Sequence, residues 1–265
     1  MFFSELPPLE SWPDLLLSGW STWAIVWCWL TVLGASVVRG YTGFGFSALV
    51  VSTHSLVLPP QEVIPATFLM EIVASVHLIP LVWKEVHWKR VLELGSGAAL
   101  AMPIGLLALG HLPEATIRGM VYGVILLCTG LLLRNLRLEH EGGRWLTIGT
   151  GAASGLANGL AAVGGLPVVL MFLATSIGAA TSRATLVAYL FAGEIYAVSW
   201  LGGQDLISFT VVLRTLLFLP ALVLGVSLGN RRFVRTPPES FRRFALWLLA
   251  IVCLLGLGRT FWGWM

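Results

Sequence analysis

The chain has 265 residues, of which 57% are hydrophobic and only 11% are charged, and its formal net charge is +3. Together with a mean hydropathy of +0.87, this composition excludes an ordinary soluble globular protein. It predicts an all-α polytopic membrane protein whose surroundings are the lipid bilayer, with no nucleic-acid partner. Residues 1–14 carry Glu5, Glu10 and Asp14 but no Lys or Arg, which is the wrong charge for the start of a signal peptide.

Ten hydrophobic segments follow one another along the chain. They cover residues 15–37, 45–58, 63–83, 91–111, 116–133, 145–162, 165–177, 184–201, 206–229 and 244–262. A fourteen-residue helix is about 21 Å long, shorter than the ~30 Å hydrocarbon core of a bilayer. The two short segments, 45–58 and 165–177, are therefore expected to be half-helices or strongly tilted helices.

Positive charge gives the orientation of these segments. If loop 84–90 is cytoplasmic and the chain alternates sides, thirteen of the sixteen Lys and Arg residues are cytoplasmic, Arg39 and Arg183 among them. Only Arg118, Arg214 and Arg259 remain outside or within the membrane. Such a bias follows the positive-inside rule. It predicts a multi-pass protein of the inner (cytoplasmic) membrane with both termini external.

The two halves of the chain resemble each other. Pro65-Ala66-Thr67 matches Arg183-Ala184-Thr185. Gly105 matches Gly225, and each of these glycines precedes a loop that contains charged residues. Matching loops carry different charge and so belong on opposite sides, which predicts two five-helix repeats of inverted topology. The expected organisation is an external segment 1–14, a first transmembrane repeat 15–133, a cytoplasmic linker 134–144 and a second repeat 145–265.

Two glycine-rich stretches interrupt the apolar sequence. The first is Gly40–Ser47 and the second runs from Gly155 to Pro167. Glycine is costly inside a helix, by about 1 kcal/mol relative to alanine, and unwound backbone in a membrane survives only inside the protein or along a cavity. Paired breaks in corresponding places of two halves are typical of a transporter's binding site.

These breaks carry a resemblance to a known family. The Gly-Phe-Gly-Phe core at residues 43–46, the second break with Asn158-Gly159, Gly164-Gly165 and Pro167, and the tandem architecture resemble the TauE/SafE sulfite exporter family. The resemblance covers nearly the whole chain from Val38. It implies a membrane transporter of sulfite, sulfoacetate or related organosulfur anions.

An anion at the two breaks would meet backbone N–H groups and the positive ends of the helices that begin there. Neutral hydroxyl and amide donors lie close by in the sequence. The alternative is that the glycines only permit close helix packing, as Gly155 and Gly159 or Gly225 and Gly229 would. The candidate substrate-binding residues are Arg39, Gly40, Thr42, Gly43, Phe44, Gly45, Ser47, Ser154, Asn158, Gly159, Gly164, Gly165 and Pro167.

Charged residues within the predicted membrane segments form a second set of candidates. Arg214 lies eight residues inside the ninth segment, and Glu71 and Glu194 lie deep in the third and eighth. Such residues are expensive in a membrane and are expected to have partners. The carboxylates either carry protons or form a static ion pair with Arg214. Arg39 and Arg183 attract the anion or are ordinary cytoplasmic anchors, whereas His54 and His77 are interpreted as structural.

These observations favour a secondary transporter with no cofactor, and a homodimer is one possible assembly. No acidic or His/Cys cluster suggests a metal site. Cys28, Cys128 and Cys253 are isolated, which argues against a membrane redox enzyme. A passive anion channel and a structural membrane subunit remain as further alternatives.

Overall fold

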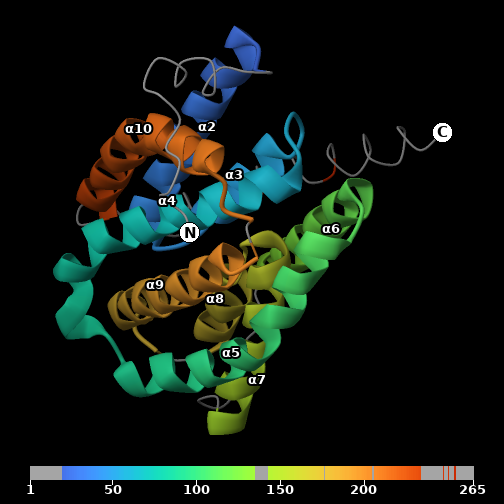
Figure 1. Cartoon of the computed structure of the whole chain (residues 1–265). Coiled ribbons are helices and arrows are strands. Elements are labelled where there is room, and N and C mark those ends of the chain that lie inside the picture. The colour runs from blue at the N-terminus through green and yellow to red at the C-terminus, as the bar shows by residue number, and fades with distance from the viewer. Residues whose placement is uncertain are drawn as a thin grey trace.

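A computed structural model describes residues 20–134, 143–175, 177–204 and 206–233, together with residues 247, 250 and 254. Within these residues the secondary structure is entirely helical (Figure 1). The nine α-helices in these ranges are α2 (Thr22–Thr42), α3 (Phe46–His54), α4 (Pro60–Val82), α5 (Trp88–His111), α6 (Glu114–Leu133), α7 (Arg144–Ala161), α8 (Gly165–Ala174), α9 (Ala179–Gly202) and α10 (Phe209–Phe233). A short 3₁₀ turn, Trp83–Glu85, follows α4.

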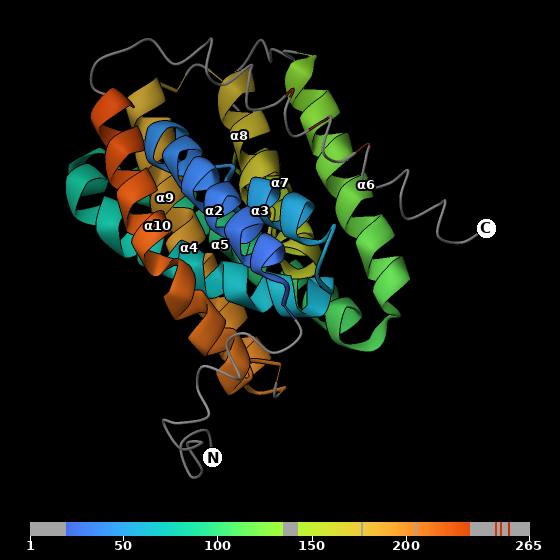
Figure 2. The ribbon, with the colours of Figure 1, turned by 90° about the horizontal axis from the view of Figure 1, so that it is seen from above.

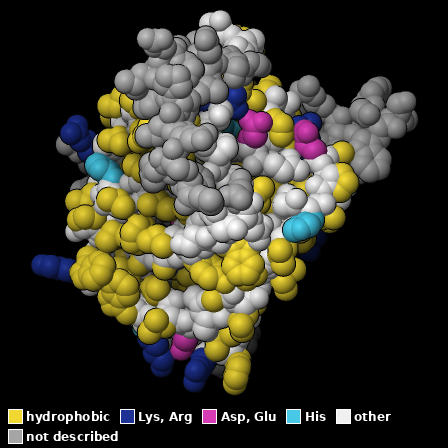
Figure 3. Space-filling model, viewed as in Figure 1, with side chains coloured by type: hydrophobic (Ala, Val, Ile, Leu, Met, Phe, Trp, Pro, Cys, Tyr) yellow, Lys and Arg dark blue, Asp and Glu magenta, His cyan; other side chains and the backbone are white. Residues whose placement is uncertain are grey.

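Six of these helices are long and apolar enough to cross a bilayer: α2, α4 with its 3₁₀ turn, α5, α6, α9 and α10. Figure 3 shows hydrophobic side chains over much of one face, with Lys and Arg toward its edges. The prediction of an all-α, multi-pass membrane protein is therefore confirmed, but its count of ten segments is not, because the described residues form nine α-helices, of which six are long and apolar enough to span. The tenth predicted segment, 244–262, lies almost wholly outside the described residues, as do residues 1–14 and most of the linker 134–144.

The two short segments form short helices, as predicted. α3 has nine residues and α8 has ten, so each is about 14–15 Å long. The hydroxyl of Thr31 in α2 lies 2.8 Å from Nε2 of His54 at the end of α3. α3 therefore turns back along α2, and the two helices form a hairpin whose tip is the first break.

The breaks are shorter than predicted. α2 continues through Gly40 to Thr42, and α7 continues through Gly155, Asn158 and Gly159 to Ala161. Only residues 43–45 and 162–164 are unwound, and they hold the positive φ angles: 82° at Gly43, 87° at Gly45 and 55° at Ala162. Glycine adopts this backbone without steric cost.

Packing explains why the other glycines remain helical. A Cβ atom on Gly40 would overlap the backbone of Val226 in α10, and one on Gly159 would overlap the Met102 carbonyl in α5. α2 and α10 lie side by side (Figure 2), as do α5 and α7. Gly40 and Gly159 therefore permit close helix packing, which was the alternative to a role in anion binding.

The helices of the two halves end and begin at a constant separation. α2 ends at Thr42 and α7 at Ala161; α3 begins at Phe46 and α8 at Gly165; α4 begins at Pro60 and α9 at Ala179, in each case 119 residues later. The packing is also reciprocal, because α10 of the second half covers α2 and α5 of the first half covers α7. α4 and α9 pack against each other between these two pairs.

Candidate functional site

The two breaks meet inside the protein. A Cβ atom on Gly165, at the start of α8, would lie 3.6 Å from Cβ of Phe44 in the first break. Phe44 and Gly165 are both buried. Segments more than a hundred residues apart therefore come together at one place, and the charged residues around that place form the candidate site.

Arg39 is the central cation of the first break. Its side chain is completely buried, and its Nη2 atom forms an ion pair with Oε2 of Glu71 in α4 at 3.0 Å. Nη2 also donates to the hydroxyl of Ser75 at 3.0 Å, and Nη1 donates to the carbonyl of Gly43. Arg39 thus attaches the tip of the α2–α3 hairpin to the middle of α4.

Arg183, near the start of α9, is a second buried cation beside the same break. Its Nη2 atom donates to the Gly40 carbonyl at 2.7 Å and to Oδ1 of Asn230 at 2.9 Å. Arg183 is 7% exposed and Arg39 is 0% exposed, so neither side chain is an exposed anchor, although one of the two predicted roles was that of an ordinary cytoplasmic anchor. Both cap carbonyls at the end of α2, where the helix dipole favours positive charge.

Neutral side chains hold the second break. The hydroxyl of Ser154 donates to the Gly164 carbonyl at 2.6 Å and lies 2.7 Å from the hydroxyl of Tyr189. Oδ1 of Asn158 accepts from the Gly164 N–H at 3.0 Å, while its Nδ2 donates to Oε1 of Glu194 at 3.4 Å. Ser154 and Asn158 therefore shape the turn between α7 and α8.

Glu71 and Glu194 belong to one electrostatic cluster. Each is 1% exposed, on the facing helices α4 and α9, and Glu194 interacts electrostatically with both Glu71 and Arg39. The Arg39–Ser75 hydrogen bond of the first half corresponds to the Asn158–Glu194 hydrogen bond of the second. Asn158 follows Arg39 by 119 residues, and Glu194 follows Ser75 by the same number. The two halves thus make the same hairpin-to-helix contact with different chemistry.

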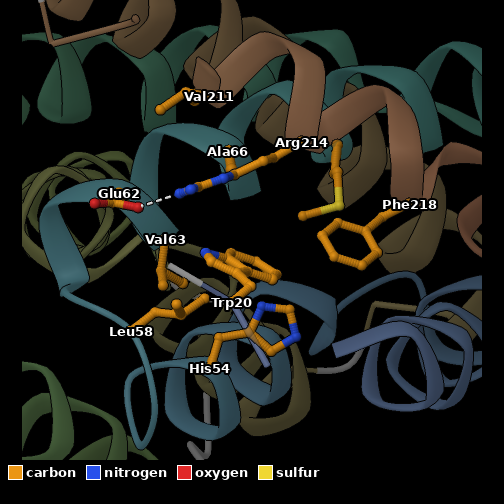
Figure 4. Close-up of a pocket in the computed structure, with 10 residues that line it drawn as sticks. Trp20, His54, Leu58, Glu62, Val63, Ala66, Val211, Arg214 and Phe218 are labelled. Atoms are coloured by element: carbon orange, nitrogen blue, oxygen red, sulfur yellow. Dashed lines mark hydrogen bonds and ion pairs between the residues drawn. The ribbon is translucent and has the colours of Figure 1, made fainter. Parts of the chain in front are cut away.

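Arg214 does not belong to this cluster, contrary to the predicted pairing with Glu71 or Glu194. Its Nη1 atom lies 2.6 Å from Oε2 of Glu62, and its guanidinium lies 4.8 Å from the ring centre of Trp20. Figure 4 shows these residues around a narrow cavity of about 30 Å³ that His54 also lines. Arg214 lies only five residues into α10, which starts at Phe209, so it is near the end of the helix.

Of the remaining predicted residues, some lie at the first break and one lies away from the charged cluster. The Thr42 hydroxyl donates to the carbonyls of Val38 and Phe44, both at 2.8 Å, and accepts from the Phe44 N–H. Ser47 is buried in the first turn of α3. Pro167 instead lines an apolar groove between α6, α7 and α8, away from the charged cluster.

Sequence reasoning missed three members of the site: Ser75, Tyr189 and Asn230. Ser75 and Glu71 are four residues apart and so share one face of α4, a signal that could have grouped them. Tyr189 lies five residues before Glu194 on α9. Nothing in the sequence around Asn230 connects it with Arg183, because that contact spans 47 residues between two helices.

These features define an α-helical multi-pass membrane protein organised around two broken helices and a buried arginine–glutamate cluster. The family model described as sulfite exporter TauE/SafE matches residues 28–255. The chain therefore belongs to the TauE/SafE family of membrane transporters, as the resemblance in the sequence indicated. No curated protein and no solved structure matches the chain.

Proposed function

We propose that the protein is a secondary transporter that exports a small sulfur-containing anion, such as sulfite, thiosulfate or an organosulfonate like sulfoacetate, with coupling to protons. The observation that carries this proposal is the meeting of two helix breaks beside two buried arginines. The name of the family, sulfite exporter, supports both the substrate class and the outward direction.

The breaks offer suitable chemistry for an oxyanion. The N-cap residues of α3 and α8 are Gly45 and Gly164, and neither supplies a side-chain acceptor to the first turn. The first N–H groups of a helix need an external acceptor, and the helix dipole favours negative charge there. Arg39 and Arg183 add positive charge close to the first of these two helix starts.

Two inverted repeats, 15–133 and 145–265 joined by the linker 134–144, are part of this proposal. The constant separation of 119 residues and the reciprocal packing of α2 with α10 and α5 with α7 support it. Because Arg39, Glu71 and Glu194 are closed off from solvent, an anion can reach the cluster only after a hairpin or a crossing helix moves. Alternating access of this kind is typical of repeat transporters.

The proposed location is the inner (cytoplasmic) membrane, with both termini external and a homodimer as the assembly. Loops 84–90 and 111–115 are then on opposite sides. Single cysteines introduced into these loops, in a variant without native cysteines, test the orientation with an impermeant thiol reagent on intact cells. Reagent should label 111–115 and not 84–90, whereas equal labelling of both loops contradicts the proposed topology.

The closed cluster favours a transporter over a passive channel, which needs a continuous path for the ion. Purified protein in liposomes separates the two. A transporter gives saturable flux of thiosulfate with counterflow, in which internal unlabelled anion accelerates uptake of labelled anion. Current without saturation or counterflow would instead identify a channel, and absence of flux and of binding for every sulfur anion tested would refute the proposed function.

A further inference from the structure

The two buried glutamates are held in different ways. Glu71 has Arg39 as an ion-pair partner at 3.0 Å. Glu194 receives one hydrogen bond at Oε1, from the neutral amide of Asn158 at 3.4 Å. Among the described residues its Oε2 atom has no hydrogen-bond partner, although the side chain is buried. A buried carboxylate without a cation at ion-pair distance is stable mainly when it can take up a proton.

The groups around Glu194 make its charge sensitive to a further anion. α4 contributes Glu71 and α2 contributes Arg39, both of which interact with Glu194 electrostatically. Tyr189 on α9 also interacts with it. α8 carries no titratable side chain, and the titratable residues of α5 and of the 3₁₀ turn lie near the ends of those elements: Lys84, Glu85, Lys89, Arg90, Glu93 and His111.

Asn158 connects Glu194 with the second break. Its Nδ2 donates to Glu194 while its Oδ1 accepts from the N–H of Gly164, just before α8. The amide oxygen has two lone pairs and can accept two hydrogen bonds. A protonated Glu194 presents an O–H donor that shares Oδ1 of Asn158 with the Gly164 N–H. Protonation therefore weakens the hold of Asn158 on this backbone N–H, which an oxyanion at the break can then accept from.

From this geometry we infer that Glu194 takes up one proton when an anion binds at the second break, and that Asn158 transmits the change between them. The inference rests on the proposed function, since it concerns the same site. Binding of an anion next to two carboxylates favours the neutral form of one of them, and by linkage the proton favours anion binding to the same degree. Glu71 already has Arg39 as its counter-ion.

Such co-binding is compatible with export. A dianion that leaves with one proton still carries one net negative charge outward. The membrane potential, negative inside, favours this movement by about 2.3 kcal/mol per 100 mV. A monovalent anion would leave as a neutral unit and would follow its concentration gradient against the pH gradient.

The test is calorimetric titration of thiosulfate, which stays fully ionised near neutral pH, into the purified full-length protein. Titrations in buffers of different ionisation enthalpy give the number of protons taken up per anion. At pH values where Glu194 is ionised before the anion binds, we expect uptake of about one proton per anion in the wild type and about a tenfold gain in affinity for each unit of pH decrease. Glu194→Gln should bind thiosulfate with no proton uptake and no such pH dependence.

Two further variants support the interpretation of this result. Glu194→Asp retains an ionisable group and should keep proton uptake, and Glu62→Gln removes a surface carboxylate and should behave like the wild type. Thiosulfate binding to the wild type without proton uptake overturns the inference while leaving intact the proposed transport of a sulfur-containing anion. Undiminished proton uptake in Glu194→Gln also overturns it, because the proton then binds elsewhere.

Discussion

Replacement of Glu71 by Gln provides a quantitative test of the buried cluster. Two unit charges 3.0 Å apart, the distance between Glu71 and Arg39, attract each other by about 5.5 kcal/mol at an effective dielectric constant of about 20. The glutamine amide retains the shape but not the charge, and Arg39 then stays buried without its counter-ion. Removal of one partner of a buried pair typically costs about 3–5 kcal/mol. We expect Glu71→Gln to lose free energy of unfolding in this range.

The matched variant is Glu194→Gln, in the same cluster and equally buried. Its amide oxygen can still accept the hydrogen bond from Asn158, and no ion pair is lost. We therefore expect a change of less than about 1 kcal/mol, which is the net value of an ordinary hydrogen bond. Two carboxylates at similar depth should thus respond to the same substitution in different ways.

A double variant, Arg39→Met with Glu71→Met, separates charge from packing. Removing both charges eliminates the unpaired ion, and buried pairs can often be replaced by apolar side chains without loss. The hydrogen bonds from Arg39 to Ser75 and Gly43 are lost, at about 1 kcal/mol each. The double variant should therefore be more stable than Glu71→Gln, but about 2 kcal/mol less stable than the wild type.

The assay is reversible unfolding in mixed micelles, followed by tryptophan fluorescence, with the free energy extrapolated to zero denaturant. Equal losses in Glu71→Gln and Glu194→Gln would refute the distinction between a paired and an unpaired carboxylate. A double variant as unstable as Glu71→Gln would show that the cost comes from packing and not from the uncompensated charge.

Three further predictions concern the turns, the helix packing and the surface ion pair. Ala162→Gly should raise stability by about 1 kcal/mol because the left-handed backbone is costly for alanine. Gly43→Ala should lower stability, since the new Cβ would lie 2.7 Å from Cγ of Arg183. Thermal melting measures both effects. Gly159→Ala should destabilise the protein by about 1–3 kcal/mol through overlap with α5. Gly149→Ala has open space around the new Cβ and should stabilise α7 by up to about 1 kcal/mol. Unfolding titrations of the two variants measure both changes in free energy. Arg214→Met should change stability by no more than about 1 kcal/mol, because its partner Glu62 is 46% exposed and exposed pairs contribute little; a loss as large as that of Glu71→Gln would contradict this.

Hydrophobic segments and their interruptions were predictable because they depend on local composition. The short helices α3 and α8 follow directly from the lengths of the apolar runs, which lie between Gly45 and Pro59 and between Gly164 and Gly178. The exact limits of the breaks were not predictable. Gly40 and Gly159 remain helical because neighbouring backbones pack against them, and this tertiary contact outweighs the intrinsic cost of glycine in a helix.

The partners of the charged residues could not be read from the sequence for a related reason. Hydropathy gives the depth of a residue in a segment but not the helix that faces it. Arg39 follows an apolar run, from which the sequence predicts either a residue that attracts the anion or a cytoplasmic anchor, but not its contact with Glu71 on another helix. Arg214 was placed deep in its segment because that segment was predicted to start at residue 206, whereas α10 starts at Phe209.

The two hairpins are attached to their crossing helices with very different strength. The α2–α3 hairpin is tied to α4 by the Arg39–Glu71 ion pair and by the hydrogen bond from Arg39 to Ser75. The α7–α8 hairpin is tied to α9 through the single Asn158–Glu194 contact at 3.4 Å and the Ser154–Tyr189 hydroxyl pair. Separation of a buried ion pair costs several kcal/mol, whereas neutral hydrogen bonds cost about 1 kcal/mol each. During transport we therefore expect the α7–α8 hairpin to leave α9 while the α2–α3 hairpin stays on α4. Distances between spin labels on each hairpin and its crossing helix, measured with and without thiosulfate, would show which hairpin moves; a change confined to α2–α3 and α4 would contradict this expectation.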